Sequence, residues 1–292
     1  MRHVLRIDDL DGGDVEDILA RAERARVGSL ERIDGSIVSL LFLSPSTRTR
    51  LGFEIAAAKL GGSAVCLTET RQTGPGLPPE TLGDTLRVCS GMSDVVVVRA
   101  DSDVMESVVN DARCPVVNGG DALEHPTQAL IDRFAIEQLA GPIGNLHVGI
   151  AGDLTMRSVT SLLAVLALSA PRRLSLFAAP GRGPTVALPA TLVERTEQPS
   201  VPEFAELDVL VLPGLPPGHG QKRLDDATRG RWALTPTTAR GLPRGAIVLS
   251  PGPVIDEIHP DCRNDPRVRV LEEADLGLFV RMGLLSWLLE QA

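Results

Sequence analysis

The sequence predicts an α/β protein made of two domains, each built on an open parallel sheet. The chain has 292 residues, which is enough for two domains of ordinary size. Short apolar runs typical of buried strands alternate with longer segments of helical periodicity. This alternation indicates parallel sheets with helices on both faces. Because ligands of such sheets bind at the carboxyl ends of the strands, we expect an interdomain cleft to hold the ligand.

The first domain is expected over residues 1–138. An acidic segment at 8–14 precedes a first amphipathic helix and is typical of a helix start. Apolar runs predict strands at 37–43, 64–67, 95–98 and 116–117. Periodicity predicts helices at 15–25, 51–60, 80–90, 102–111 and 125–139. Pro126, near the first helical position of the last of these, favours a helix start there.

The second domain is expected over residues 139–275. It follows the turn formed by Gly141 and Pro142 and repeats the pattern of strand and helix. The sequence predicts strands at 146–151, 174–177, 209–212, 247–249 and 268–271, and a helix at 158–169. The last helix, within 276–292, is apolar on several faces, so we expect it to pack back on the first domain.

Composition and charge exclude several classes of protein. A hydrophobic fraction of 43% and a charged fraction of 23% are typical of a soluble globular protein. No segment reaches the roughly 20 apolar residues that span a bilayer, and the first residues lack the apolar core of a signal peptide, so we expect a cytoplasmic protein with no membrane partner. The net charge of -9 argues against nucleic-acid binding.

The cysteines do not form a metal-binding pattern. The chain has four of them, without a CxxC pair: Cys66, Cys89, Cys114 and Cys262. This spacing favours reduced, mostly buried thiols over a zinc site.

The most informative stretch follows the first strand, where segment 46–50 is Ser-Thr-Arg-Thr-Arg. A helix start offers unpaired N–H donors and a partial positive charge. Three hydroxyls and two guanidiniums in five residues add the groups that bind a small oxyanion such as phosphate. The simpler interpretation is a helix cap with solvated arginines, but a cap needs only one hydroxyl.

Two other places in the first domain carry candidate polar groups. His125 precedes a helix and Gln128 lies one turn later, so both can face the same point. The histidine can donate to a carbonyl oxygen, and the glutamine can accept from an amide NH2 group. Arg99 ends an apolar strand. Taken alone, a histidine at a helix start is more often a cap or core residue, and an arginine at a strand end is more often a surface residue.

Together these stretches resemble the aspartate and ornithine carbamoyltransferases. The matching motifs are Ser-Thr-Arg-Thr-Arg at 46–50 with Phe-Glu at 53–54, and His-Pro-Thr-Gln at 125–128. Segments 149–154 and 251–253 also fit, so the resemblance spans most of the chain. It implies a carbamoyltransferase-like fold in which the first domain binds carbamoyl phosphate and the second binds an amine acceptor. It also implies a homotrimer that needs neither a metal nor an organic cofactor.

The resemblance implies a role for each matching residue. Ser46, Thr47 and Arg48, with Thr49, would hold the phosphate. Arg99, His125 and Thr49 would hold the carbonyl oxygen, where negative charge grows during transfer. Gln128, with a backbone carbonyl near Pro251, would orient the carbamoyl NH2 group. The predicted catalytic residues are Arg48, Thr49, Arg99, His125 and Gln128. The predicted substrate-binding residues are Ser46, Thr47, Arg48, Thr49, Arg99, His125, Gln128, Arg157, Pro251 and Gly252. Arg50 is expected to support the loop through a carboxylate partner.

The acceptor half departs from the family pattern. Gly74 and Pro78 stand where the aspartate enzymes have a serine and a lysine that reach the neighbouring subunit's site. Ser250 and Val254 replace a histidine and an arginine around the Pro-Gly-Pro turn, and segment 212–218 lacks the arginine and glutamine that bind aspartate. The His-Cys-Leu-Pro turn of the ornithine enzymes is also absent.

These departures lead to a main hypothesis and two alternatives. Because a dianionic aspartate needs several cations, the main hypothesis is a carbamoyltransferase with a less charged acceptor, such as a diamino acid or a secondary-metabolite amine. One alternative is an aspartate carbamoyltransferase in which Arg71 or Gln72 replaces the missing loop residues. The other is a non-catalytic homologue that binds an anion or serves as a structural partner. A dinucleotide enzyme is disfavoured because segment 149–153 lacks the GxGxxG pattern.

Overall fold

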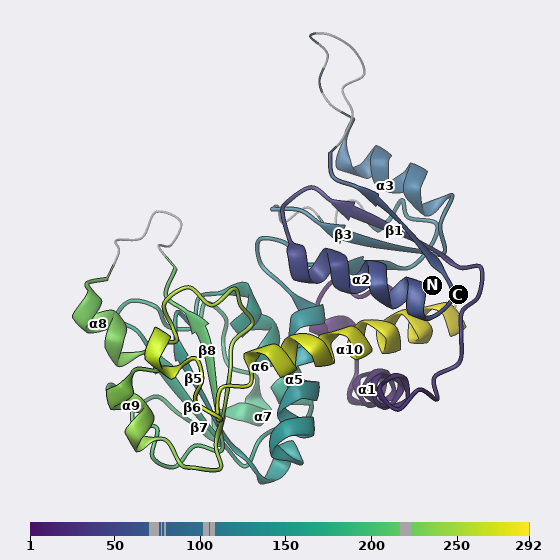
Figure 1. Ribbon diagram of the computed structural model, residues 1–292. Helices are drawn as coiled ribbons and strands as arrows, with labels where there is room; N and C mark the ends of the chain where they lie inside the picture. Colours follow the sequence, from purple (N-terminus) through teal and green to yellow (C-terminus); the bar gives the residue numbers. More distant parts are fainter. Residues whose placement is uncertain are drawn as a thin grey trace. The chain divides into compact units, whose positions relative to one another are not determined.

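The chain folds into two compact units, each with its own parallel sheet (Figure 1). The computed structural model describes residues 1–69, 76, 78, 80–101, 105, 109–216 and 224–291. The first unit comprises Met1–Ile131 with Asp275–Ala292, and the second comprises Asp132–Ala274. The predicted fold class, two α/β domains with parallel sheets, is confirmed.

The sheet of the first unit has four parallel strands in the order β2-β1-β3-β4. They are β1 (Ile37–Phe42), β2 (Ser63–Leu67), β3 (Val95–Arg99) and β4 (Val116–Asn118). The central strands β1 and β3 are mostly apolar and buried, as expected of parallel strands that are covered on both faces. Phe42 lies opposite Arg99, and Val98 lies opposite Asn118. The carboxyl ends of three strands therefore meet at one edge.

Helices cover both faces of this sheet. They are η1 (Ile7–Asp9), α1 (Gly12–Arg26), α2 (Thr47–Lys59) and α3 (Leu82–Ser90), with the C-terminal part of α10 (Val270–Glu290). On one face, Leu86 of α3 packs with Leu41 and Val96 of the central strands. Helix α2 lies on the opposite side of these strands (Figure 1). This arrangement fixes the start of α2 at the carboxyl edge of the sheet.

The C-terminal part of α10 packs against α1. Gly283 is the closest point, since a Cβ atom there would lie 2.6 Å from the Ile18 carbonyl oxygen and 2.7 Å from the Ala22 nitrogen. Arg21 of α1 donates to Ser286 Oγ (3.1 Å) and to Glu290 Oε2 (2.7 Å). The last helix, from Asp275 on, is thus part of the first unit, although it lies some 150 residues after the rest of that unit.

The second unit has a five-stranded parallel sheet in the order β7-β6-β5-β8-β9. Its strands are β5 (His147–Gly152), β6 (Arg173–Ala178), β7 (Thr196–Glu197), β8 (Val209–Gly214) and β9 (Ile247–Leu249). Its helices are η2 (Ile143–Asn145), α6 (Arg157–Leu168), α7 (Ala190–Val193), α8 (Asp226–Arg231), α9 (Pro236–Gly241) and η3 (Pro260–Cys262). Helix α5 (Pro126–Ala140) runs from the first unit into the second.

Several local predictions differ from the structure. Helix α2 begins at Thr47 and not at residue 51, so most of the anion-binding motif forms its first turn. Of the strand predicted at 268–271, only Val268 pairs, through a single parallel bridge to Val248 of β9, because α10 already begins at Val270. Glu272 and Glu273 in its first turn complement the helix dipole. They favour a helix start here, whereas the apolar run alone favours a strand. The elements α7, α8, α9 and β7 are too short to show a clear period. The helix predicted at 102–111 lies largely outside the described residues.

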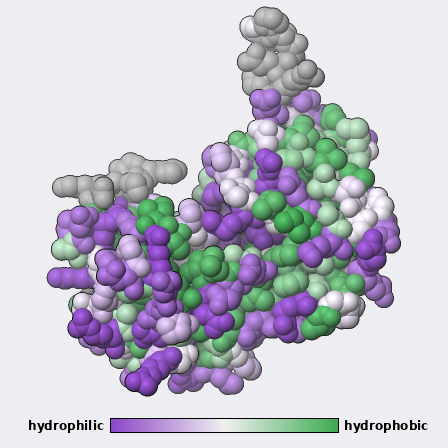
Figure 2. Space-filling view, in the orientation of Figure 1, coloured by the Kyte–Doolittle hydropathy of each residue, from purple (hydrophilic) through white to green (hydrophobic). Residues whose placement is uncertain are grey.

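Hydrophilic residues are spread over the face of the molecule shown in Figure 2, with hydrophobic residues between them. Among the helices in the described part of the chain, none combines the length and apolarity that crossing a bilayer requires.

The four cysteines are free thiols, and three are buried. Burial raises the pKa of Cys114 to about 11, so this thiol stays protonated near neutral pH.

The close approach at Gly283 gives a stability prediction. Gly283→Ala forces α10 away from the α1 backbone, and such overpacking costs about 1–3 kcal/mol. We expect a lower urea midpoint for the first unit. The chain has only two tryptophans, and Trp287 lies in the first unit while Trp232 lies in the second. Fluorescence in a Trp232→Phe background therefore reports the first unit alone.

Gly230→Ala is the matched control for this substitution. Gly230 is in α8, and a Cβ atom there would meet nothing within 4 Å. The midpoint of the first unit should be unchanged, because Gly230 lies in the second unit and the added methyl group meets no neighbour. An unchanged midpoint for Gly283→Ala would contradict the packing described above.

Candidate active site

The predicted anion-binding motif lies at the start of α2. Ser46 is the N-cap residue, but its hydroxyl makes no capping hydrogen bond. A simple helix cap therefore does not explain this side chain. Thr47 and Arg48 are exposed in the first turn, and Thr49 is buried. The hydroxyls and the guanidinium thus accompany the unpaired N–H groups and positive dipole end of a 13-residue helix, a combination that favours an anion.

The two arginines of the motif have different surroundings. Arg50 pairs with Glu54 one turn later, with 3.1 Å between Nε and Oε1, which confirms the expected carboxylate partner. Among the described residues, Arg48 has no such ion pair. Arg48 is therefore the guanidinium of this motif that remains to bind an external anion.

Arg99 and His125 meet at the same edge of the sheet. Arg99 Nη1 donates to the Gly119 carbonyl oxygen (2.8 Å) and lies 3.4 Å from His125 Nε2. Both side chains are at least nine-tenths buried. His125 Nδ1 lies 3.2 Å from Thr127 Oγ1, which helps to fix the ring. A guanidinium and an imidazole held at one point can stabilise a single oxygen that gains negative charge.

Gly120 makes this contact sterically feasible. Its φ angle is +110°, a conformation that favours glycine. A Cβ atom there would lie 2.5 Å from Arg99 Nη1 and 2.9 Å from His125 Cδ2. The sequence analysis assigned no role to this residue. The turn-forming string Asn-Gly-Gly-Asp at 118–121 is the signal that could have revealed it.

Asn118 and Asp121 fix the turn that carries His125. Asn118 Oδ1 accepts from the Gly120 N–H (2.8 Å), and Asn118 Nδ2 donates to Asp121 Oδ2 (2.9 Å). Asp121 Oδ1 accepts from two backbone N–H groups later in the turn. Both side chains are buried, so this network holds the turn in one conformation.

Gln128 lies in the first turn of α5, which begins at Pro126. Its backbone N–H donates to the His125 carbonyl oxygen (3.0 Å), and its side chain is half-buried. Because β1, β3 and β4 end side by side, the structure brings the predicted donor-binding residues to one edge of the first sheet. These residues are Ser46, Thr47, Arg48, Thr49, Arg99, His125 and Gln128.

The other predicted residues belong to the second unit. Arg157 is the first residue of α6 and is half-buried. Pro251 and Gly252 follow β9, and the Gly252 N–H donates to Ser250 Oγ (3.1 Å). These positions lie after the carboxyl ends of β5 and β9. They are therefore on the ligand-binding edge of the second sheet.

The turn at 250–253 is surrounded by carboxylates. Ser250 Oγ donates to Glu257 Oε1 (2.9 Å), and the Ser250 N–H donates to Glu273 Oε2 (3.0 Å). Both glutamates are buried. Val254 packs against the apolar core of the second unit, so it contributes no polar group. Gly74 lies outside the described residues.

A buried ion pair at the same edge was missed by the sequence analysis. Asp153 follows β5, and Arg182 follows β6. Arg182 Nη1 donates to Asp153 Oδ2 (2.9 Å), and both side chains are almost fully buried. No local sequence pattern connects two residues on separate loops. Since Asp153 compensates Arg182, the pair adds no net charge to this edge.

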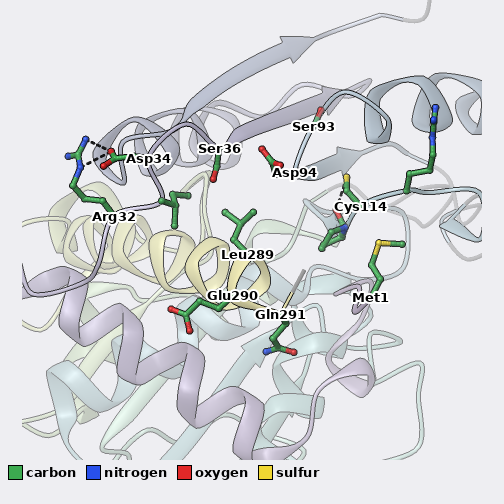
Figure 3. A pocket seen from close by; sticks show the side chains of 13 residues that line it. Met1, Arg32, Asp34, Ser36, Ser93, Asp94, Cys114, Leu289, Glu290 and Gln291 are labelled. Atoms are coloured by element: carbon green, nitrogen blue, oxygen red, sulfur yellow. Dashed lines mark hydrogen bonds and ion pairs between the residues drawn. The ribbon is translucent and has the colours of Figure 1, made fainter.

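Two cavities of the first unit lie at opposite edges of its sheet. One of about 560 Å³ adjoins the anion-binding motif and is lined by Ser46, Thr47 and Arg50 among others. The other, of about 800 Å³, lies where β1, β3 and β4 begin (Figure 3). Its charged residues include Arg32 and Asp34, which pair with each other (Figure 3). The cavity at the carboxyl edge is the better candidate for an anionic ligand, although its lining does not include Arg48, Arg99 or His125.

Known proteins share this architecture over the whole chain. A family model described as aspartate/ornithine carbamoyltransferase, carbamoyl-P binding domain, matches residues 2–138. The aspartate carbamoyltransferase catalytic subunit of Methanospirillum hungatei is 34% identical over 302 residues, which cover 98% of this chain and 99% of that protein.

Solved structures agree with this result. The aspartate transcarbamoylase catalytic subunit of M. Jannaschii has a TM-score of 0.82 at 27% identity and covers 100% of this chain and 99% of that one. Aspartate transcarbamoylase from Trypanosoma cruzi in complex with carbamoyl aspartate and phosphate has a TM-score of 0.87 at 26% identity, over 98% and 95% of the two chains. The chain therefore belongs to the aspartate/ornithine carbamoyltransferase family and is a carbamoyltransferase.

Proposed function

We propose that this enzyme transfers the carbamoyl group of carbamoyl phosphate to the amino group of aspartate and releases phosphate. The observation that carries the donor half is the convergence of Arg99 and His125 beside the start of α2. Aspartate is proposed because full-length relatives are named aspartate carbamoyltransferase. The comparisons thus favour the alternative from the sequence analysis over its main hypothesis of a less charged acceptor.

In the proposed reaction, the uncharged amine attacks the carbamoyl carbon. The carbonyl oxygen becomes negative in the tetrahedral intermediate, where Arg99, His125 and the Thr49 hydroxyl stabilise it. The C–O bond to phosphate then breaks, the phosphate carries away the electron pair, and the nitrogen loses a proton. Much of the rate comes from holding the two substrates in position.

The phosphate binds at the start of α2 in this proposal. Ser46 and Thr47 donate from their hydroxyls, and Arg48 supplies the guanidinium. The N–H groups of the first helical turn add further donors. Gln128 orients the carbamoyl NH2 group. Each group is present on the carboxyl edge of the first sheet.

The residue proposed to bind the acceptor is Arg157, which provides a cation for a carboxylate at the start of α6. A backbone carbonyl near Pro251, in the turn that also contains Gly252, is proposed to orient the carbamoyl NH2 group together with Gln128. A second candidate acceptor is a less charged amine. It is favoured by Gly214, Ser250 and Val254, where the family pattern has groups that bind aspartate, and by the buried Glu257 beside the turn.

We also propose a homotrimer, as the family resemblance implies. Helix α2 exposes Leu51 and Ile55, and β2 exposes Val65. These apolar side chains offer a surface that a neighbouring copy could cover. Light scattering after gel filtration should give three times the chain mass of 31.0 kDa, and a monomer would contradict this proposal. The cytoplasmic location stays a prediction.

Removing the oxyanion donors should slow the chemical step. We expect His125→Ala and Arg99→Met each to lower kcat about 10²–10³-fold, because one preorganised donor is worth about 2.7–4 kcal/mol. Phosphate release from carbamoyl phosphate and a saturating acceptor measures this. His259→Ala is the matched control, since His259 is half-exposed in the second unit. Near-normal rates for His125→Ala would remove it from the mechanism.

The acceptor is identified by radioactive carbamoyl transfer to a panel of amines. The panel contains aspartate, ornithine, other diamino acids and neutral amino acids. We expect aspartate to be carbamoylated, and Arg157→Met to raise its KM at least tenfold because a carboxylate loses its cation. Turnover of a diamino or neutral amine without turnover of aspartate would establish the second candidate. Stabilisation by carbamoyl phosphate without transfer to any amine would indicate a non-catalytic homologue.

A further inference from the structure

We propose that Arg281 of α10 is a positioning residue whose buried positive charge lies near Arg48 and so strengthens binding of the donor phosphate. This inference rests on the proposed donor site. Neither the motifs nor the family resemblance assigned a role to Arg281. Both arginines belong to the first unit.

Arg281 is a buried cation without a compensating anion. Its side chain is 4% exposed, and its Nε atom has no hydrogen-bond partner. Within the described ranges, no carboxylate forms an ion pair with it. A buried charge is costly unless it is paired, so the retention of an unpaired guanidinium in this place calls for a compensating group from outside the chain.

The guanidinium of Arg281 lies against two glycines and one aromatic ring, which are Gly52, Gly277 and Phe53. A Cβ atom at Gly52 would lie 2.7 Å from Arg281 Nη1, and one at Gly277 would lie 2.9 Å from the same atom. The guanidinium stacks over the Phe53 ring at 5.7 Å from its centroid. The space beside α2 and within α10 is therefore shaped for a guanidinium.

Gly52, which contacts Arg281, lies one helical turn after Arg48, the residue proposed to bind the phosphate. Arg48 and Gly52 are four residues apart in α2, and residues at this spacing are neighbours on one helix face. Arg281 therefore lies against the face of α2 that carries Arg48. The buried guanidinium of Arg281 is thus close to the first turn of α2, which carries Arg48.

The two guanidiniums repel each other when no anion is present. Burial, with a further contribution from the Arg48 charge, lowers the pKa of Arg281 to about 10, so the group is still charged near neutral pH. A phosphate dianion at the start of α2 would be attracted by both charges and would offset their repulsion. Arg281 would then contribute to phosphate affinity without touching the ligand.

The test compares Arg281→Met, which removes the charge, with Arg281→Lys, which keeps it. The probe is inorganic phosphate, and its Kd is measured by calorimetry. We expect Arg281→Met to raise the Kd about tenfold, or about 1.4 kcal/mol, and to raise the KM for carbamoyl phosphate similarly with kcat changed less than about threefold. Arg281→Lys should stay within about threefold of the wild type. Arg240→Met, an exposed arginine in α9, is the control.

Thermal melts separate this role from a purely structural one. Without phosphate, the Tm of Arg281→Met should equal or exceed that of the wild type, because an unpaired buried charge has been removed. The rise in Tm on adding phosphate should shrink. An unchanged Kd in Arg281→Met would overturn the inference, and so would loss of affinity with a lower ligand-free Tm in both variants. If the wild type itself does not bind phosphate, this result contradicts the proposed donor site, and with it the role of Arg281 that rests on that site.

Discussion

The parallel register of β1, β3 and β4 is the constraint on which the donor site depends. It places Phe42 beside Arg99 and Val98 beside Asn118, so three loops leave the sheet at one edge. The first loop leads into α2 and the third carries His125. The absence of a side chain at Gly120 then lets Arg99 approach His125. A shift of one residue in β3 would turn Arg99 toward the opposite face and separate it from the histidine.

Much of the proposed donor site could be located from the sequence because its signals are local. Ser46 to Thr49 are contiguous, and His125 and Gln128 are one turn apart. The strands of the first unit are continuous apolar runs, and their carboxyl ends set the position of Arg99. The first turn of α2 was assigned to a loop because hydroxyl residues compete with helical hydrogen bonds. The same residues favour the helix start.

The missed features depend on contacts between distant segments. The Asp153–Arg182 pair joins two loops that follow different strands, and no periodicity marks it. Arg281 lies more than 220 residues after Gly52, yet the two are in contact. The apolar run at 268–271 predicted a strand because periodicity cannot distinguish a short buried strand from a helix start. The acidic residues Glu272 and Glu273 lie in the first turn of α10 and stabilise the helix start.

The distribution of charge gives the donor and acceptor residues opposite character. On the donor side, Arg48, Arg99 and Arg281 lie near one sheet edge, and the structure supplies no carboxylate partner for Arg48 or Arg281 among the residues it describes. On the acceptor side, Arg182 is compensated by Asp153, and the 250–253 turn is hydrogen-bonded to Glu257 and Glu273. Two cations without a carboxylate partner in the described part of the chain, Arg48 and Arg281, favour a dianion, which fits the proposed site for the donor phosphate. A compensated edge discriminates by shape and by single hydrogen bonds, and in the proposed site Arg157 supplies the cation for a carboxylate of the acceptor.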